Sequence, residues 1–243
     1  MNILITGATS GIGLATAVRF AKEGHHIILG YFQNSPERQT AELKIQQAGG
    51  TFSPMHIDIA DLESISELEN NLGKTSTPID VLVNCAGVYD EHEFLDSTPE
   101  IWDHVIGTNL RGTYFMTQVI ARQMVSAGHG AIVNVASVAG IYPRKNHLEY
   151  AISKAGIIHM TKCLAQTLAP IRVNAVAPSY TWSKFMDFME DKEKVAQKIA
   201  QIPLGRFNDP EDVAESIFFL ASSKARNITG EVLILDGGRG ARL

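Results

Sequence analysis

The chain alternates between short, mostly apolar runs and longer stretches in which apolar residues recur every three or four positions. Short β-branched runs that are apolar on both faces are typical of strands in a parallel sheet covered on both sides. Six such runs are present: Ile3–Ile5, Ile27–Leu29, Val81–Val83, Ile132–Val135, Val173–Val176 and Val232–Leu235. The segment Phe52–Ile57 is a weaker candidate for a seventh strand.

The stretches between these runs have the period of amphipathic helices. The predicted helices are Gly11–Lys22, Pro36–Ala48, Leu62–Leu72, Glu100–Met124, Tyr150–Leu168 and Pro210–Phe219. Prolines with neighbouring acidic residues mark two of the helix starts, at Pro99 and Pro210, as is usual in a first turn. Alternation of strand and helix along residues 1–243 predicts one α/β domain, doubly wound and Rossmann-type, with a seven-stranded parallel sheet and helices on both faces.

One segment, residues 179–201, interrupts the alternation between the sixth strand and the last helix. It contains the aromatic residues Trp182, Phe185 and Phe188. Long insertions in compact domains are more often functional than accidental, so we expect a substrate lid here. Two interpretations of the aromatic side chains are open: contact with substrate, or packing in the core.

Composition and charge exclude several classes of protein. The chain has 21 basic and 26 acidic residues, a formal net charge of -5, and no basic run, so we expect no nucleic-acid partner. No apolar run approaches the ~20 residues of a membrane span, and the first residues lack a cationic leader, so we expect no membrane association. Two cysteines without paired spacing fit a reducing compartment, which predicts a cytoplasmic protein. Eight scattered histidines predict no metal site. An enzyme or a binding protein remains.

A glycine-rich turn follows the first predicted strand and opens the first predicted helix. Its glycines, Gly7, Gly11 and Gly13, are spaced G-x-x-x-G-x-G. Glycines at this place allow a tight turn and let backbone N–H groups approach a pyrophosphate at the positive end of a helix. A packing role is the alternative, since any strand-to-helix turn can collect glycines. The position at the first turn of a doubly wound sheet favours a dinucleotide.

Three further motifs occur in order with this turn: Asn84–Gly87 after the fourth strand, Tyr150-Ala-Ile-Ser-Lys154 at the start of a helix, and Asp236–Gly238 near the end. With them the chain resembles the short-chain dehydrogenase/reductase family over nearly its whole length. Within this family it is most similar to bacterial 3-oxoacyl-[acyl-carrier-protein] reductases and their relatives, which reduce ketones of varied kinds. The resemblance implies a nicotinamide-dependent oxidoreductase.

A possible catalytic set consists of Asn109, Ser137, Tyr150 and Lys154. Tyr150 and Lys154 are four residues apart and therefore share one face of a helix. A free tyrosine has a pKa of ~10, and a neighbouring cation favours the phenolate, so we expect Lys154 to draw the pKa of Tyr150 toward neutrality. Ser137 ends the fifth strand, where a hydroxyl can bind a substrate oxygen or cap the following turn.

The resemblance adds roles to this set. It implies that Lys154 binds the nicotinamide ribose, and that Asn109 distorts its long helix and holds a water that relays protons to Lys154. The alternative for Asn109 is an ordinary polar helix residue.

The resemblance also implies the residues that bind the cofactor. Asp58 is expected at the adenine amino group, Asn84, Ala86 and Gly87 along the adenosine ribose, and Thr181 and Ser183 at the carboxamide. The predicted cofactor-binding residues are Gly7, Thr9, Ser10, Gly11, Ile12, Gly13, Tyr31, Asp58, Ile59, Asn84, Ala86, Gly87, Tyr150, Lys154, Thr181 and Ser183. One departure from the family pattern is Ser179, where Pro-Gly is usual; it leaves the conformation of that loop open.

The predicted cofactor is NADP(H), with NAD(H) possible. NAD-specific members usually have an acid at the end of the second strand, where it binds the ribose 2′-hydroxyl and repels a phosphate. Here the strand is followed by Gln33, Asn34 and Ser35, with no acid before Glu37. No basic residue stands directly after the strand, and Arg38 belongs to the next helix. We therefore do not expect the preference for NADP(H) over NAD(H) to be strong.

The predicted substrates are a small-molecule ketone or an acyl-carrier-protein thioester. The alternatives are a sugar or secondary alcohol dehydrogenase of the same family and a catalytically silent nucleotide-binding sensor. A sensor is expected to lack one of the four catalytic residues, and all four are present. We also expect a homotetramer, because Met116, Ile120, Ile157 and Met160 supply more apolar surface than one sheet face covers.

Overall fold

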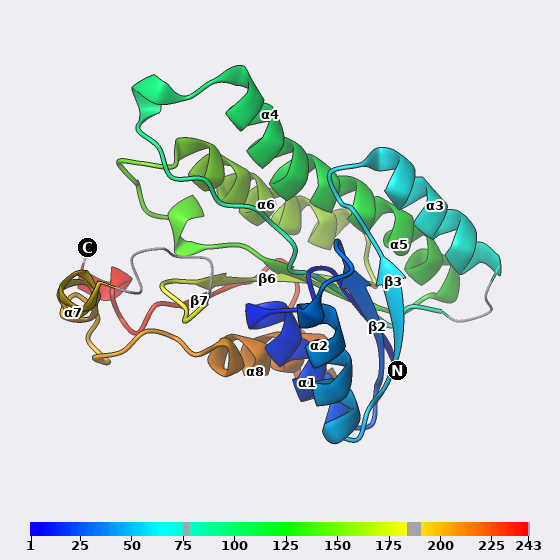
Figure 1. Ribbon diagram of the computed structural model, residues 1–243. Helices are drawn as coiled ribbons and strands as arrows, with labels where there is room; N and C mark the ends of the chain where they lie inside the picture. Colours follow the sequence, from blue (N-terminus) through cyan, green and yellow to red (C-terminus); the bar gives the residue numbers. More distant parts are fainter. Residues whose placement is uncertain (75–77, 184–190, 243) are drawn as a thin grey trace.

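The computed structural model describes residues 1–74, 78–183 and 191–242, which form one α/β domain around a parallel sheet (Figure 1). The strands are β1 (Asn2–Ile5), β2 (His26–Tyr31), β3 (Thr51–His56), β4 (Val81–Asn84), β5 (Ala131–Val135), β6 (Arg172–Pro178) and β7 (Val232–Leu235). The helices are α1 (Gly11–Ala21), α2 (Pro36–Gln47), α3 (Leu62–Lys74), α4 (Pro99–Ile106), α5 (Thr113–Ala127), α6 (Leu148–Thr167), α7 (Lys192–Ile199) and α8 (Pro210–Ala221). The seven strands lie in the order β3-β2-β1-β4-β5-β6-β7, so the predicted fold class is confirmed.

Helices cover both faces of the sheet: α1, α2 and α8 lie on one face and α3, α5 and α6 on the other (Figure 1). Successive side chains of a strand point to opposite faces. Ile3 and Ile5 of β1 therefore pack in one core with Phe20 of α1, whereas Leu4 packs in the other with Met116 of α5. Each fully buried side chain of this size contributes roughly 1.5–3 kcal/mol, which explains why the strands tolerate so few polar residues.

The buried α5 and α6 residues do not form an association surface. Met116, Ile120, Ile157 and Met160 are between 0% and 9% exposed, because they pack inside the chain against the sheet and neighbouring helices. The argument that these four residues leave apolar surface for a partner is therefore wrong. Apolar exposure occurs elsewhere, for example at Ile234 of the edge strand β7, which is 42% exposed.

The predicted helix from Glu100 to Met124 is divided in the structure. α4 ends at Ile106, a π-helical turn runs over Gly107–Gly112, and α5 begins at Thr113. A π turn holds one more residue than an α turn and is frequent at functional sites. Gly112 fits this turn tightly, since a Cβ there would lie 2.1 Å from the Ile59 carbonyl oxygen. The turn also carries Asn109, which is 1% exposed.

The lid expected over residues 179–201 is described only in part. Phe185 and Phe188 lie outside the described residues, and α7 occupies 192–199. Trp182 contacts the ring of Phe207 at 5.1 Å between centroids and is 39% exposed. None of the helices in the described part combines the length and hydropathy that a transmembrane span requires.

Candidate active site

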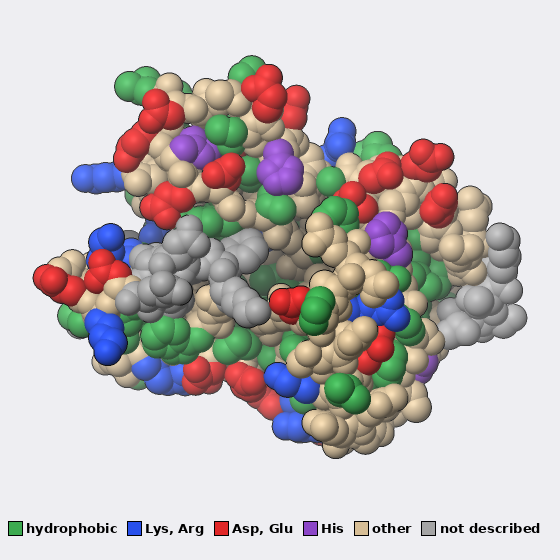
Figure 2. Space-filling model, in the orientation of Figure 1, with side chains coloured by type: hydrophobic (Ala, Val, Ile, Leu, Met, Phe, Trp, Pro, Cys, Tyr) green, Lys and Arg blue, Asp and Glu red, His purple; other side chains and the backbone are tan. Residues whose placement is uncertain are grey.

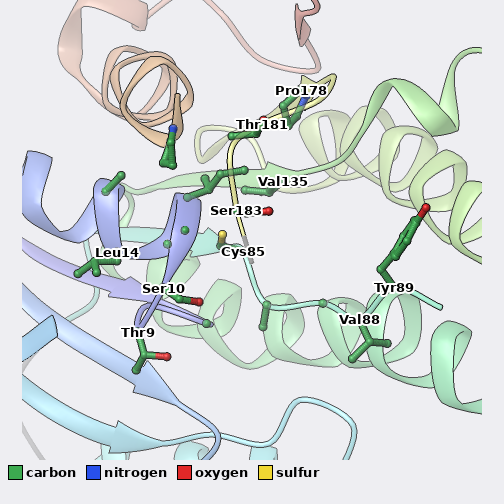
Figure 3. A pocket seen from close by; sticks show the side chains of 18 of the residues that line it. Thr9, Ser10, Leu14, Cys85, Val88, Tyr89, Val135, Pro178, Thr181 and Ser183 are labelled. Atoms are coloured by element: carbon green, nitrogen blue, oxygen red, sulfur yellow. The ribbon is translucent and has the colours of Figure 1, made fainter. Parts of the chain in front are cut away.

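A large cleft of about 1470 Å³ opens at the carboxyl edge of the sheet. It lies where β1 and β4 are neighbours, which is the point at which the chain reverses its direction of winding and leaves a crevice. Figure 3 shows Thr9 and Ser10 on the turn after β1, the sulfur of Cys85 after β4, and Tyr89 at the far end. The predicted residues that line the cleft are Gly7, Thr9, Ser10, Gly11, Ile12, Gly13, Asp58, Ile59, Ala86, Gly87, Ser137, Tyr150, Lys154, Thr181 and Ser183.

The glycines of the turn have two roles: Gly7 and Gly13 allow close packing, and Gly11 leaves space in the cleft. Gly7 has φ +64°, and a Cβ on Gly13 would lie 2.2 Å from the Gly7 carbonyl oxygen, so both residues close the turn. Gly11, at φ +49°, has only Ser183 Cβ at 4.0 Å in the direction of a side chain, so it faces open space. The side chain of Ser10 makes no capping hydrogen bond to α1. The first N–H groups of α1 are therefore free of a side-chain cap, as anion binding at a helix N-terminus requires.

The residues around the cleft fit a nicotinamide dinucleotide. The glycine turn provides a backbone cradle at one end, and two buried hydroxyls that line the cleft, Thr108 Oγ1 and Ser179 Oγ, have no hydrogen-bond partner among the described residues. Buried polar groups are normally paired, so these hydroxyls are suited to meet a bound ligand. Ser179 does not have positive φ, and the serine in place of the usual glycine therefore causes no backbone strain.

Ser137 and Tyr150 both line the cleft, and Ser137 acts on the Tyr150 phenol in the direction that lowers its pKa. The Ser137 oxygen accepts a hydrogen bond from the backbone N–H of Ala139 at 3.1 Å, so the capping interpretation is confirmed, whereas binding of a substrate oxygen stays a prediction. Lys154, one turn along α6, donates to the carbonyl oxygen of Val135 at 2.8 Å, and its Nζ lies 5.6 Å from the centre of the Tyr150 ring.

Asn109 lies behind this wall rather than on it. Its Oδ1 accepts from the Val88 N–H at 2.8 Å, and its Nδ2 donates to the Val88 carbonyl at 2.9 Å and to Ser153 Oγ at 3.2 Å. A Cβ on Gly87 would be 3.0 Å from Asn109 Oδ1 and 3.7 Å from Lys154 Nζ, so the amide and the ammonium flank the same glycine. Asn109 thus fixes the loop after β4 against α6.

Burial dominates the electrostatics of the cleft wall that carries Tyr150 and Lys154. It raises the pKa of the Tyr150 phenol, although Ser137 and the charge of Arg144 act in the opposite direction. It also lowers the pKa of Lys154 to about 8. Both shifts have one cause, because a site shielded from water disfavours the charged form of either group. The prediction that the pKa of Tyr150 shifts toward neutrality is therefore wrong for the chain alone, because burial shifts it upward.

Two predicted cofactor residues lie outside the cleft lining. Asn84 is 5% exposed and donates from Nδ2 to Thr117 Oγ1 and to Asn134 Oδ1, both at 2.8 Å. Its side chain therefore links β4 to α5 and β5 instead of facing a ligand. Tyr31 lies beneath the guanidinium of Arg38, whose Cζ is 4.6 Å from the ring centre. Neither position was distinguishable by spacing alone, because a strand end can point a side chain inward or outward.

Several residues that line the cleft were not among the predicted site residues, among them Tyr89, Arg144, His147, Tyr180 and Lys198. Tyr89 packs edge-on against Tyr150 at 5.2 Å, and its hydroxyl is 2.9 Å from His147 Nε2. His147 has a left-handed backbone at φ 61°, which histidine tolerates better than most residues. These residues come from four separate segments, and no local motif marks them. Among the described residues no group of three or more His, Cys, Asp or Glu side chains is arranged to hold a metal ion.

Comparison with known proteins gives matches over nearly the whole chain. A family model described as enoyl-(acyl carrier protein) reductase matches residues 7–239. The chain is 40% identical over 240 residues to the 3-oxoacyl-[acyl-carrier-protein] reductase FabG of Thermotoga maritima, covering 97% of this chain and 96% of the relative. It is 36% identical over 245 residues to an L-rhamnose 1-dehydrogenase (NAD(P)(+)) of Azotobacter vinelandii, covering 98% and 95%.

A solved structure from Agrobacterium tumefaciens with bound NADP has a TM-score of 0.91 and 30% identity to this chain, and the match covers 99% of this chain and 96% of that one. That protein carries a provisional assignment as a 2-deoxy-D-gluconate 3-dehydrogenase. The relatives therefore share the fold and a redox reaction at a carbon–oxygen bond, whereas their substrates differ.

Proposed function

Because this chain belongs to the short-chain dehydrogenase/reductase family, we propose that it reduces 3-oxoacyl-[acyl-carrier-protein] thioesters to 3-hydroxyacyl thioesters with NADPH. The chain is an oxidoreductase that acts on C=O or CH–OH groups with a nicotinamide cofactor. The observation that carries the finer proposal is that Ser137, Tyr150 and Lys154 line one cleft, with Tyr150 and Lys154 one helical turn apart on α6.

In the proposed reaction one residue donates a proton, and the other three bind the substrate oxygen, stabilise the phenolate or position the donor. When bound, the cofactor supplies the hydride that reduces the carbonyl carbon. Tyr150 donates its phenolic proton to the carbonyl oxygen, since burial raises its pKa and keeps it protonated near neutral pH. Ser137 accepts from Ala139 and keeps its own O–H to donate to the same oxygen. Lys154 stabilises the phenolate that Tyr150 becomes, and Asn109 holds α6 and the loop after β4 in place.

We propose NADPH as the preferred cofactor because the end of β2 lacks an acid that would repel a phosphate. Gln33 and Ser35 line the cleft there. Arg38 donates to Glu42 Oε1 at 2.7 Å and to Asn34 Oδ1 at 3.2 Å. The 2′-phosphate of NADPH would therefore be bound mostly by neutral donors. Because neutral hydrogen bonds are weaker than charge-assisted ones, we expect a modest preference for NADPH over NADH. Glu37 also lines the cleft and opposes the phosphate. The test is kcat/KM for both cofactors with one accepted ketone.

Two outcomes of this test are decisive. An advantage for NADPH that grows in Glu37→Gln supports the proposal, because that substitution removes an acid from the cleft lining. A tenfold advantage for NADH in the natural chain contradicts it.

The main alternative is a sugar or secondary alcohol dehydrogenase, because relatives at similar identity are named for both activities. The discriminating experiment follows the absorbance of the reduced cofactor with acetoacetyl thioesters and NADPH, and with L-rhamnose and the oxidised cofactors. Faster turnover of the thioester supports the proposed function. Turnover of the sugar alone, or of neither substrate, overturns it.

We propose that the chain assembles as a homotetramer. Support comes from apolar side chains at the surface of α4, α6 and β7: Trp102, Ile152 and Ile234 are 42%, 44% and 42% exposed. Self-association with closed symmetry is a common way to cover such surface. Light scattering at micromolar concentration tests this, and a monomer mass contradicts it. The cytoplasmic location and the lack of nucleic-acid and membrane partners stay predictions.

A further inference from the structure

The hydroxyl of Ser179 is buried in the cleft lining without a hydrogen-bond partner. Ser179 is 9% exposed, and no group within the described part of the chain bonds to its Oγ. Both backbone groups of this residue are paired: its N–H donates to the Leu235 carbonyl at 2.9 Å, and its carbonyl accepts from Thr181 Oγ1 at 3.1 Å. Because buried polar groups are normally paired, a ligand bound beside this hydroxyl can complete its hydrogen bonding.

The loop that carries Ser179 is fixed by hydrogen bonds to Asn208 and β7. The Asn208 N–H donates to the Tyr180 carbonyl, and the Asn208 carbonyl accepts from the Trp182 N–H, both at 2.9 Å. The Asn208 side chain donates to the Leu235 carbonyl at 2.8 Å, the same carbonyl that accepts from the Ser179 N–H. The backbone at Ser179 is therefore in place before a ligand binds, which lowers the entropy that binding costs.

The sheet order places Ser179 on the same side of the glycine turn as Lys154. Neighbouring strands follow one another as β1-β4-β5-β6, and the glycine turn comes after β1. Val135 at the end of β5 is in register with Val176 of β6, and the Val135 carbonyl accepts from Lys154 Nζ. Ser179 stands three residues after Val176, so it follows the strand next to the one that anchors Lys154.

The segment after Ser179 leads back to the glycine turn. A Cβ on Gly11 would lie 4.0 Å from Ser183 Cβ, and Figure 3 shows Thr181 and Ser183 following Pro178 along the cleft. A dinucleotide with its pyrophosphate at the glycine turn would therefore have its nicotinamide half beside residues 179–183. The carboxamide is the polar group of that half that lies farthest from the pyrophosphate, and Ser179 is the residue of this segment nearest to the end of β6.

We propose that Ser179 Oγ forms a hydrogen bond to the nicotinamide carboxamide of the bound cofactor. A serine hydroxyl both donates and accepts, and a carboxamide has a C=O that accepts and an NH₂ that donates, so the two groups match without charge. Thr181, which the family resemblance places at the carboxamide, is 5% exposed and donates its hydroxyl hydrogen to the Ser179 carbonyl. The proposal rests on the nicotinamide cofactor, and neither on the acyl substrate nor on the preference for NADPH.

The test measures the binding of three ligands that differ in length. NADP⁺ carries the whole nicotinamide, 2′-phospho-ADP-ribose lacks the nicotinamide ring, and 2′,5′-ADP lacks the second ribose as well. Calorimetric titration gives their dissociation constants for the natural chain, Ser179→Ala and Ser179→Gly. We expect both variants to bind NADP⁺ about fivefold more weakly, the effect of one neutral hydrogen bond, and to bind the two fragments as the natural chain does. The series NAD⁺, ADP-ribose and ADP repeats the test without the 2′-phosphate.

These substitutions leave the charge of the protein unchanged. On the face in Figure 2, acidic side chains spread over α3 and α4, whereas Lys and Arg side chains lie around α7 at the opposite edge. Such charges act on all three anionic ligands, so a variant of equal charge isolates the effect of the hydroxyl. Ser126→Ala, at an exposed serine of α5 outside the cleft lining, is the matched control and should leave all three dissociation constants unchanged.

Thermal unfolding gives a second measurement that needs no substrate. A buried hydroxyl without a partner destabilises the folded chain, so Ser179→Ala should unfold at a higher temperature than the natural chain when no cofactor is present. At one fixed concentration of NADP⁺ the rise in unfolding temperature should be smaller in Ser179→Ala, because a ligand that binds more weakly stabilises less.

Three results overturn the proposal. The first is equal affinity of the natural chain and Ser179→Ala for NADP⁺. The second is an equal loss for NADP⁺ and 2′-phospho-ADP-ribose, because the hydroxyl would then bind the ribose or the phosphates. The third is a lower unfolding temperature of Ser179→Ala without cofactor, because the hydroxyl would then have a partner inside the protein. If the difference for NADP⁺ appears but no 3-oxoacyl thioester is reduced, the proposed function fails and the role of Ser179 stands.

Discussion

The two ends of the cleft are built from different parts of the chain. At the cofactor end, a turn with positive φ at Gly7 and Gly11 presents backbone N–H groups to open space. At the substrate end, side chains from separate segments converge, such as Tyr89, Tyr150 and Tyr180. Backbone binding depends on local conformation, whereas side-chain chemistry depends on tertiary packing and burial. Substitutions at one end should therefore affect affinity for the cofactor, and at the other the rate and its pH dependence.

The largest effect is expected for Tyr150→Phe. The variant lacks the phenolic proton, which is used only in the transition state, so kcat should fall ~10²–10⁴-fold. Cofactor affinity, measured by fluorescence titration, should change little because the glycine turn is untouched. Retention of more than about a tenth of kcat contradicts the role of Tyr150, and a matching loss of cofactor affinity contradicts the separation of the two ends.

Lys154→Met tests how much the buried charge of Lys154 lowers the free energy of unfolding. Burial lowers the pKa of Lys154 from 10.5 to about 8, so folding with a charged Lys154 near pH 7 costs about 3 kcal/mol. The substitution removes this cost but leaves the Val135 carbonyl without its donor, which returns about 1 kcal/mol. Urea unfolding at pH 7 should therefore show a variant more stable by roughly 1–3 kcal/mol and inactive.

The sign of the pH dependence provides a check on this prediction. Between pH 8 and 10.5 the unfolded chain binds more protons at Lys154 than the folded chain does, so the free energy of unfolding of the natural chain should rise across this range. The rise should be absent in Lys154→Met. A variant less stable than the natural chain at pH 7, or an equal rise in both proteins, contradicts the buried charge.

The rate of ketone reduction should fall as the pH rises through about 8. Lys154 loses its proton there and no longer stabilises the phenolate, while the raised pKa of Tyr150 leaves the phenol protonated in the same range. We expect a slope of about tenfold per pH unit above the midpoint, measured as kcat/KM with saturating cofactor. A midpoint well above 10 would assign the titration to Tyr150 and not to Lys154.

The smallest effect is expected at the glycine turn. Gly11→Ala and Gly49→Ala both place a Cβ on a residue with positive φ, +49° and +85°, and nothing lies within 4 Å of a Cβ at Gly49. Each should lower the free energy of unfolding by about 1 kcal/mol. Only Gly11→Ala should weaken cofactor binding, by up to about tenfold, because its methyl group enters the cradle. Equal cofactor affinities in the two variants would place the cofactor away from this turn.

The sequence predicted the fold, and the residues that line the glycine-turn end of the cleft, better than the residues that line the other end, for a physical reason. Six of the seven strands are marked by apolar residues on both faces, and the glycine turn is marked by residues that few others can replace. Arg144, His147 and Lys198 carry no such local signature, because their place in the cleft depends on how distant loops pack. Asn84 shows the converse error, since its motif position was correct but its side chain points into the polar interior.

The pKa values of Tyr150 and Lys154 required the structure for a different reason. Spacing along α6 indicates that the two residues share a helix face, but it does not show how much water reaches them. Burial depends on the cleft walls, and it decides the direction of both shifts.

The π-helical turn over Gly107–Gly112 has a consequence for how this chain tolerates insertions and deletions. One residue advances an α-helix by about 100°, so a chain shorter by one residue here would run as a regular helix from Pro99 to the end of α5. The downstream residues would then keep their faces toward the sheet, but Asn109 would lose its inward position. We therefore expect that relatives lacking this one residue keep the core of the domain. They should lose the two hydrogen bonds between the Asn109 side-chain amide and the backbone of Val88.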